Sequence, residues 1–179
     1  MTNADPHPVR TSGPGLVVRA AATSDDDALR EIDLATWGPA NSPAPPPPAE
    51  EPFFSERNPL TDHLVAELDG AVVGYVKLQQ TVPIPSHEHV LTINGLAVAA
   101  RAQGRGVGRA LIEAAIARAT RLGARKLSLR VLGPNAGARR LYEACGFEVE
   151  GVLRGEFVLA GVEVDDHLMA RRLDDLSGG

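Results

Sequence analysis

Three glycines at alternate positions stand directly before an amphipathic segment, an arrangement that is typical of a loop that binds an anion. They are Gly104, Gly106 and Gly108, within the run QGRGVGR at residues 103–109. Glycine lets a backbone approach a bulky anion, and the free N–H groups and positive dipole of a following helix stabilise phosphate charge. Arg105 and Arg109 offer charge-assisted hydrogen bonds to the same anion. The run therefore predicts a phosphate-binding loop, with a purely structural turn as the alternative.

Two common phosphate loops do not fit this run. A Walker A loop needs the pattern G-x-x-x-x-G-K-[ST], which the chain lacks. A dinucleotide-binding fingerprint counted from Gly104 meets Arg109 where its third glycine belongs. The remaining interpretation is the pattern Q-x-x-G-x-G, which begins at Gln103.

A second group of residues, further along the chain, contains a candidate acid. Asn135 stands where a helix is expected to begin, and Asn is a preferred helix N-cap. Tyr142 follows within that helix, and a phenol with a pKa of about 10 can donate a proton to a group of similar basicity. The alternative for Tyr142 is core packing, at helical spacing from Ala138 and Leu141.

A general base is harder to find. The strand before the glycine loop carries Thr92 and Asn94 at its centre, and neither can act as a base. Glu88 stands at the start of this strand between two histidines and is the candidate base, with a merely solvated cluster as the alternative. Residues 165–167 (DDH) lie near the end of the chain. They either bind a cationic acceptor or are solvated side chains at a sheet edge.

The pattern of apolar residues predicts the elements that must position these groups. Strands are expected at 16–19, 63–68, 71–79, 89–98, 126–132, 147–152 and 156–169, the last interrupted around Gly161, and helices at 23–37, 109–122 and 135–145. Gly95 is expected to form a bulge or splay point in its strand. The order of elements predicts one α/β domain over 16–175, with about four helices layered on a mixed, mostly antiparallel sheet of about six or seven strands. Residues 1–15 are expected to be a disordered tail.

Residues 38–59 interrupt this pattern. The prolines at 43 and 45–48 cannot supply the backbone donors that a helix or a central strand needs, so an extended loop is expected. Two interpretations are open. The loop is either a mobile surface connection or one wall of an acceptor site, with Trp37, Phe53 and Phe54 as pocket residues.

Composition excludes several classes of protein. A chain of 179 residues suits one domain. No run of apolar residues is long enough for a membrane-spanning helix, and the polar start of the chain lacks a signal sequence, so a cytoplasmic protein is expected. The net charge of −5 argues against nucleic-acid binding. The single cysteine, Cys145, excludes an intrachain disulfide, and no spacing of ligand residues indicates a metal site.

Together, the two motifs resemble the GNAT superfamily of acetyl-coenzyme A-dependent N-acetyltransferases. The pattern Q-x-x-G-x-G is similar to the family's pyrophosphate loop, and residues 135–147 are similar to its signature N-x-x-A-x-x-L-Y-E-x-x-G-F. The resemblance covers about 16–173, and its specific part is 91–147. Residues 162–173 are also similar to the closing strand of the subgroup that includes amino-terminal and antibiotic acetyltransferases.

The resemblance implies acetyl-coenzyme A as the co-substrate and implies which residues bind it. The implied set is Leu96, Ala97, Val98, Gln103, Gly104, Arg105, Gly106, Val107, Gly108, Arg109, Asn135 and Tyr142. Backbone groups of Leu96 and Val98 would pair with the pantetheine arm where two strands splay, and the amides of 103–108 would hold the pyrophosphate. Asn135 would bond the pantetheine or the thioester side. Tyr142 would protonate the leaving thiolate, and the N–H of Val98 would polarise the carbonyl.

The predicted function is transfer of an acetyl group to a primary amine by direct attack in a ternary complex. The acceptor is either a small-molecule amine or the amino group of a peptide or protein, with no nucleic acid or membrane involved. The sequence is compatible with a homodimer. The alternative is a catalytically silent acyl-coenzyme A-binding sensor or interaction module, which the missing base at the centre of the strand keeps open.

Overall fold

The computed structural model describes residues 9–10 and 15–174 of the chain, and these form one mixed sheet with helices on both faces. The eight strands among the described residues are β1 (Val9–Arg10), β2 (Leu16–Ala20), β3 (His63–Leu68), β4 (Ala71–Gln79), β5 (Val90–Val98), β6 (Lys126–Leu132), β7 (Glu148–Leu159) and β8 (Val162–Arg172). Their order in the sheet is β1-β2-β3-β4-β5-β6-β8-β7. All neighbours are antiparallel except β5 and β6, which are parallel. The predicted mixed, mostly antiparallel sheet is confirmed.

The described residues form three α-helices, where about four helices were expected. They are α1 (Asp26–Thr36), α2 (Val107–Arg121) and α3 (Ala136–Ala144). Four short 3₁₀ turns complete the set: η1 (Thr23–Asp25), η2 (Leu60–Asp62), η3 (Pro85–His87) and η4 (Ala100–Ala102). None of the helices in the described part of the chain is long and apolar enough to cross a membrane.

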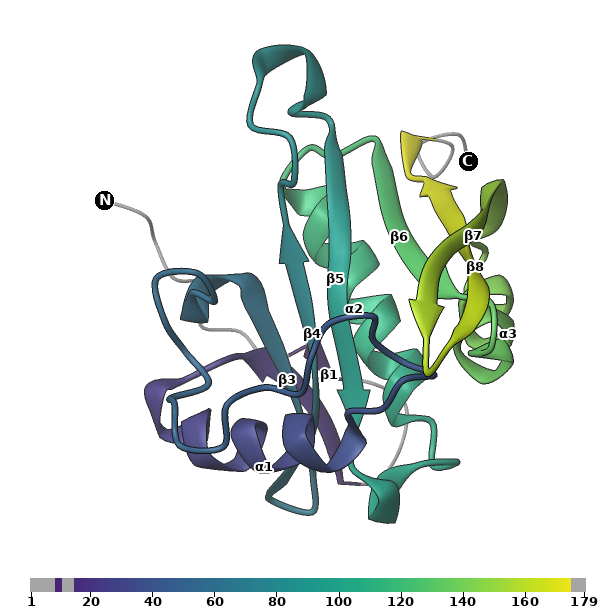
Figure 1. The fold of residues 1–179 in the computed structure, drawn as a ribbon. Coiled ribbons are helices and arrows are strands. Elements are labelled where there is room, and N and C mark those ends of the chain that lie inside the picture. The colour runs from purple at the N-terminus through teal and green to yellow at the C-terminus, as the bar shows by residue number, and fades with distance from the viewer. Residues whose placement is uncertain (1–8, 11–14, 175–179) are drawn as a thin grey trace.

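The larger core lies between the sheet and the pair α2 and α3. Leu111 and Ile112 of α2 are fully buried there against Leu127 and Leu129 of β6. Burial of each such side chain stabilises the fold by about 1.5–3 kcal/mol. Figure 1 shows α2 and α3 behind the sheet and α1 in front of it.

A smaller core lies on the opposite face, beneath α1. Leu29 and Ile32 of α1 pack there with Val65, Tyr75 and Ala97 of the sheet. In the view of Figure 1, α1 lies in front of β3, β4 and the lower end of β5, and no helix lies in front of the upper part of β5 and β6. No helix therefore covers that face of the sheet beside its parallel strand pair.

Several boundaries differ from the expectation. Val9–Arg10 of the predicted tail form β1 and pair with β2, while residues 1–8 and 11–14 of that tail, and residue 175 of the predicted domain, lie outside the described residues. Helix α2 begins at Val107, two residues earlier than expected. The break predicted after Val152 is an irregularity within β7, and the hairpin turns at Ala160 and Gly161, which have φ values of 49° and 81°.

The single cysteine, Cys145, follows directly after α3 and is 6% exposed. Burial raises the pKa of its thiol, and its backbone carbonyl accepts a hydrogen bond from Arg171 at 2.5 Å. Cys145 is therefore a buried packing residue.

Candidate active site

The parallel strands β5 and β6 form a fork. They pair only over residues 90–93 of β5 and 126–129 of β6. Beyond that point β5 stays paired with β4 as far as Val98, and β6 stays paired with β8 as far as Leu132. Figure 1 shows the two strands side by side at one end and separating toward the C-terminal end of β5. One edge of residues 94–98 therefore has no strand partner, at the gap between the backbones of β5 and β6.

A bulge in β5 opens this fork. Asn94 and Gly95 together stand opposite a single residue of β4, Lys77, where the pairing of the two strands shifts. Gly95 has a φ of 150°, and a Cβ at this position would lie 3.4 Å from the ring of Tyr75. A bulge bends its strand and increases the local twist, which turns β5 away from β6. The predicted bulge at Gly95 is confirmed.

The hydrogen-bonding direction alternates along β5. The N–H of Ala99 donates to the carbonyl of Val73 in β4 at 2.8 Å. Because successive residues of an antiparallel strand bond to opposite sides, Ala97 also faces β4, while Leu96 and Val98 face the fork. The carbonyl of Val98 already accepts a bond from the side chain of Gln103 at 3.0 Å. Both backbone groups of Leu96 and the N–H of Val98 thus face the gap.

The glycine loop leads from β5 into the first turn of α2. Gly104 and Gly106 have φ values of 72° and 80°, and no atom lies within 4 Å of the position that a Cβ would occupy on either residue. The first backbone bond into the helix joins the N–H of Ala110 to the carbonyl of Gly106, so the N–H groups of residues 107–109 have no helical acceptor. The loop and helix start together form an open cradle with positive polarity.

Two residues of the predicted loop have structural roles. Gly108 has no positive φ, and a Cβ on it would lie 3.0 Å from Leu141, so its small size lets α2 and α3 approach closely. The N–H of Gln103 is engaged with the carbonyl of Ala100 at 3.3 Å, which leaves residues 104–109 as the open part of the cradle. The sequence predicted that a ligand approaches all three glycines. The geometry fits this prediction at Gly104 and Gly106, and Gly108 serves the packing of the two helices.

Two arginines flank the cradle. Arg105 lies 3.9 Å from Asp69, and Arg109 lies 2.8 Å from Glu113. Both arginine side chains are more than half exposed, and exposed ion pairs contribute little free energy. Both guanidinium groups can therefore turn to an anion in the cradle.

Tyr142 lies in α3, on the side of the sheet that α2 covers. It is 6% exposed, and its ring meets that of Phe147 edge to face at 5.7 Å. Burial raises the pKa of Tyr142 well above its ordinary value, so the hydroxyl keeps its proton at neutral pH. None of the described residues forms a hydrogen bond with this hydroxyl. The side chain is part of the core and also a protonated donor, so the two interpretations of Tyr142 are compatible.

Asn135 joins α3 to the proline-rich loop. Its Oδ1 caps α3 by accepting from the N–H of Ala138 at 3.1 Å. Its Nδ2 donates to Oδ1 of Asn41 at 3.3 Å, across 94 residues of sequence. In the view of Figure 1 the loop that follows α1 crosses in front of the gap between β5 and β6.

This loop is fastened at both ends. The indole N–H of Trp37 donates to the carbonyl of Ala44 at 3.1 Å. The carboxylate of Asp26 accepts the N–H groups of Phe53 and Phe54 at 3.1 and 2.9 Å. Phe53 is 9% exposed and packs in the core beneath α1, and it also lines a pocket with Pro47 and Pro48 of this loop. The interpretation of the loop as a wall of an acceptor site stays a prediction.

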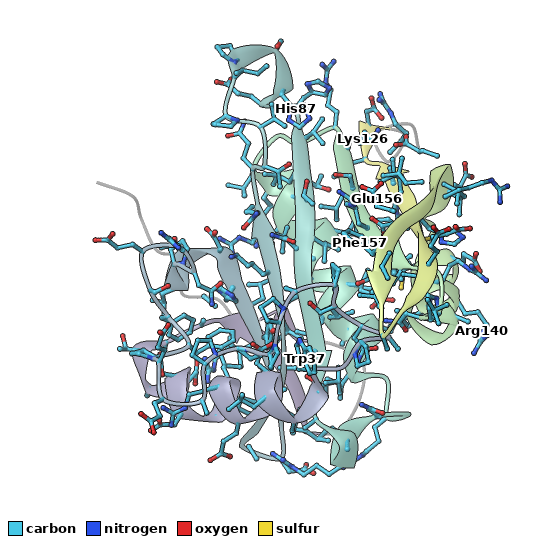
Figure 2. All side chains as sticks on the ribbon, in the orientation of Figure 1. Trp37, His87, Lys126, Arg140, Glu156 and Phe157 are labelled. Carbon is cyan, nitrogen blue, oxygen red and sulfur yellow. The ribbon has the colours of Figure 1, made fainter. Side chains whose placement is uncertain are left out.

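The other predicted groups lie apart from the fork. Glu88 is exposed in the loop before β5, and Figure 2 shows its neighbour His87 beside the start of β5. The strand from Val90 to Leu96 spans about 20 Å, so Glu88 lies at the wrong end of β5 to reach the fork. Thr92 shares a hydrogen bond with Ser128 at 3.0 Å. Within residues 15–174, no group of three His, Cys, Asp or Glu side chains is placed to hold a metal ion.

Residues 165–167 each have their own partner and do not form one patch. Asp165 accepts from the N–H of Gly155 at 2.9 Å. Asp166 is buried and accepts from Nε of Arg130 at 2.5 Å. His167 lies 3.3 Å from Arg139 of α3. Arg130 was missed by the sequence analysis, although its signal is present: polar residues at 126, 128 and 130 alternate with apolar ones along β6.

A buried aromatic cluster supports this architecture from the α1 side. His63 is 1% exposed among Phe53, Phe54 and Tyr75, and its Nδ1 lies 2.9 Å from the carbonyl of Pro59. Burial lowers the pKa of His63 to about 4, so the imidazole is neutral. The hydroxyl of Tyr75 donates to Asp33 of α1 at 2.5 Å, which fastens the helix to the sheet beneath the bulge.

Comparison with known proteins agrees with this geometry. The sequence model of the Acetyltransferase (GNAT) family matches residues 27–147, which include the fork, the cradle and Tyr142. The chain belongs to this family.

Three relatives of this acetyltransferase match it over nearly their whole length. The L-amino acid N-acetyltransferase AaaT of Escherichia coli (strain K12) is 33% identical over 162 residues, which are 87% of this chain and 97% of AaaT. The crystal structure of smu.2055 from Streptococcus mutans UA159 is 28% identical with a TM-score of 0.77, over 87% of this chain and 98% of that one. The acetyltransferase yncA of Salmonella typhimurium, solved with acetyl-coenzyme A, has a TM-score of 0.75 at 22% identity, over 92% and 97% of the two chains.

Proposed function

We propose that this GNAT protein transfers the acetyl group of acetyl-coenzyme A to a primary amine, by direct attack in a ternary complex. The observation that carries the proposal is the juxtaposition of two unpaired sets of backbone groups. Leu96 and Val98 face the fork, and residues 104–109 form the open cradle at the start of α2. A thioester on an extended arm with a pyrophosphate at its other end fits both sets at once.

The binding step follows from these groups. The pantetheine arm takes the place of a strand beside β5 and pairs with Leu96 and Val98. The pyrophosphate is held by the amides of the cradle and the positive end of α2, with Arg105 and Arg109 as additional donors. Asn135 stands at the other side of the fork, where its amide bonds the arm in place of Asn41.

The chemical step has four parts. The amine nitrogen attacks the thioester carbon, a C–N bond forms and the C–S bond breaks. The N–H of Val98 stabilises the negative charge on the carbonyl oxygen. Tyr142 gives its proton to the leaving thiolate and contributes about 100- to 10,000-fold to the rate. The amine loses its proton to water, because Glu88 lies at the other end of β5.

The acceptor that we propose is a small amine with the size of an amino acid. The name of AaaT specifies L-amino acids as its acceptors, and the present chain covers almost all of that protein. The loop fastened to Asn135 by Asn41 supports a small acceptor, because it narrows the approach to the fork.

The first test is calorimetric binding of acetyl-coenzyme A to the wild type, to Gly106→Glu and to Gly123→Glu. Gly106 and Gly123 lie at opposite ends of α2, both have a φ of 80°, and neither has an atom within 4 Å of its Cβ position. The two variants therefore carry the same strain and charge, and only Gly106→Glu places a carboxylate in the cradle. We expect micromolar binding to the wild type and to Gly123→Glu, and loss of binding in Gly106→Glu.

Two other results would change the conclusion. If the wild type does not bind acetyl-coenzyme A, the proposed function is wrong and the cradle has only a structural role. If it binds tightly but releases no free thiol with a broad panel of amines and amino acids, the chain is a sensor of acyl-coenzyme A. The lack of a carboxylate at the centre of β5 is the observation that favours this second function.

A further inference from the structure

Arg130 is the first residue of β6 beyond the point where β5 and β6 stop pairing. The last pair is Ile93 with Leu129. Leu129 and Val131 are buried in the core on the α2 side. Because side chains alternate along a strand, Arg130 lies on the other face of the sheet, which α1 covers only in part. A guanidinium group therefore stands at the mouth of the fork, on the face that an acceptor can approach.

Side chains of the β7–β8 hairpin hold this guanidinium in place. Its Nε donates to Asp166 at 2.5 Å, its Nη2 donates to Glu156 at 3.1 Å, and its carbon lies 5.8 Å from the centre of the Phe157 ring. Figure 2 shows Glu156 and Phe157 between β5 and the hairpin. The Arg130 side chain is nevertheless 51% exposed. It is oriented by three contacts and still reachable from solvent.

Part of the bonding capacity of this group is unused. A guanidinium carries five N–H donors, and Asp166 and Glu156 engage the edge formed by Nε and Nη2. No residue within 15–174 bonds Nη1, so the edge formed by Nη1 and Nη2 can receive a carboxylate in two-bond geometry. Glu156 bonds Arg130 through Oε1, and its Oε2 has no partner in that same part of the chain.

The charges of this group select a particular class of molecule. Arg130 is neutralised by the buried Asp166, and Glu156 leaves the three side chains with one negative charge in excess. A simple carboxylate would meet repulsion from both acids, and a simple ammonium would meet repulsion from Arg130. A zwitterion avoids both, because its carboxylate and its ammonium can each face the opposite charge. In an α-amino acid a single carbon separates the two groups, which suits partners 3.1 Å apart.

We propose that Arg130 and Glu156 recognise the acceptor as a free α-amino acid, with Arg130 bonding its carboxylate and Glu156 its ammonium group. This inference rests on the proposed function and adds the residues that choose its acceptor. It also accounts for release of the product. Once acetylated, the nitrogen is an uncharged amide, so its attraction to Glu156 ends while the repulsion between the two carboxylates remains.

The test compares L-amino acids with their carboxamides as acceptors. Each pair has the same side chain and differs at the carboxyl group. The difference in amine basicity is the same for every variant, so the change in the ratio of the two kcat/KM values between wild type and variant isolates the contact with Arg130. We expect Glu156→Gln and the double variant Arg130→Gln/Asp166→Asn to raise KM for amino acids at least about tenfold, as is typical of a lost charged hydrogen bond. The double variant should leave kcat/KM for the carboxamides within about twofold. The paired substitution avoids leaving Asp166 buried without a partner.

Arg154→Gln is the matched control. Arg154 lies on the β7–β8 hairpin, is 86% exposed and lies 4.0 Å from Asp165, so the variant removes an ion-paired arginine away from the fork. Arg154→Gln should change neither the KM for amino acids nor the KM for carboxamides. Equal losses with amino acids and carboxamides in the double variant would mean that Arg130 only supports the hairpin. An unchanged KM for amino acids would also overturn the proposal.

A second readout does not depend on turnover. Calorimetric binding of the same amino acids to the protein saturated with coenzyme A should be measurable for the wild type and lost in the double variant. If the wild type turns over no acceptor but shows this difference, the proposed function fails and the recognition element stands. If the wild type acetylates amines without preferring amino acids over carboxamides, the recognition element fails and the proposed function stands.

Discussion

At the scale of single residues, the sharpest consequence concerns the Tyr142 hydroxyl. Tyr142→Phe removes the proposed proton donor and leaves the ring contact with Phe147. We expect kcat to fall about 100- to 10,000-fold while the affinity for acetyl-coenzyme A changes less than about twofold. Thiol release in a single turnover, together with calorimetry, measures the two effects separately. An unchanged kcat would mean that Tyr142 is only a packing residue.

The raised pKa of Tyr142 also predicts a pH dependence. A group acts as an acid only below its pKa, and burial raises the pKa of Tyr142 above its ordinary value of 10.0. The kcat of the wild type should therefore show no loss from ionisation of Tyr142 up to a pH of about 10. An alkaline decline with a midpoint below 10 that disappears in Tyr142→Phe would contradict this.

A second residue, His63, predicts how stability depends on pH. Burial lowers the pKa of His63 from 6.5 to about 4. Between these values the unfolded chain binds a proton that the folded chain does not, so the free energy of unfolding falls as pH falls through this window. At pH 5 the loss is about 2 kcal/mol relative to pH 7.5. Urea unfolding at pH 7.5 and at pH 5 measures this loss in the free energy of unfolding. In His63→Gln the loss should be smaller than in the wild type by about 2 kcal/mol. Equal losses in the wild type and in His63→Gln would refute the lowered pKa of His63.

At the scale of elements, Asn135 connects the cap of α3 to the proline-rich loop. Asn135→Ala loses both bonds and should lower the free energy of unfolding by about 1 kcal/mol. Asn135→Asp keeps an oxygen for the cap and loses the donor to Asn41, so it should keep its stability. The single tryptophan, Trp37, is bonded within the loop and reports its release by fluorescence.

Both substitutions should change this fluorescence, and so should Asn41→Ala, which leaves the cap intact. If only Asn135→Ala changes the fluorescence, the change comes from the lost cap of α3, and the loop is not held by Asn135.

Local signals explain which elements could be predicted from the sequence. The bulge at Gly95, the cradle glycines at 104 and 106, and the cap at Asn135 each depend on residues close in the chain, and all four were expected. Gly108 was assigned to ligand binding, because its actual contact is with Leu141 on another helix and a contact between distant residues is not visible in the sequence. Arg130 was missed for the same reason, since its partners lie 26 and 36 residues further along the chain.

At the scale of the whole molecule, the fork joins two parts of the sheet whose contact an extended ligand should complete. Acetyl-coenzyme A at 100 times its Kd should stabilise the fold by about 2.7 kcal/mol. In hydrogen exchange, the amides of Leu96, Val98 and residues 107–109 should become protected. The amides of Ala97 and Ala99 should not change, because they already face β4. Equal protection along the whole of β5 would indicate general tightening without strand-like pairing.

The buried position of Cys145 has a practical consequence for work with this protein. The reaction liberates a small-molecule thiol, which is most simply followed with a thiol-reactive dye. The chain has one cysteine, it is 6% exposed, and its raised pKa keeps the poorly nucleophilic protonated form. The folded protein should therefore contribute almost no background colour. Without any acceptor, a slow reaction of one dye molecule per chain would come from Cys145. The rate of that reaction would measure how often the end of α3 opens.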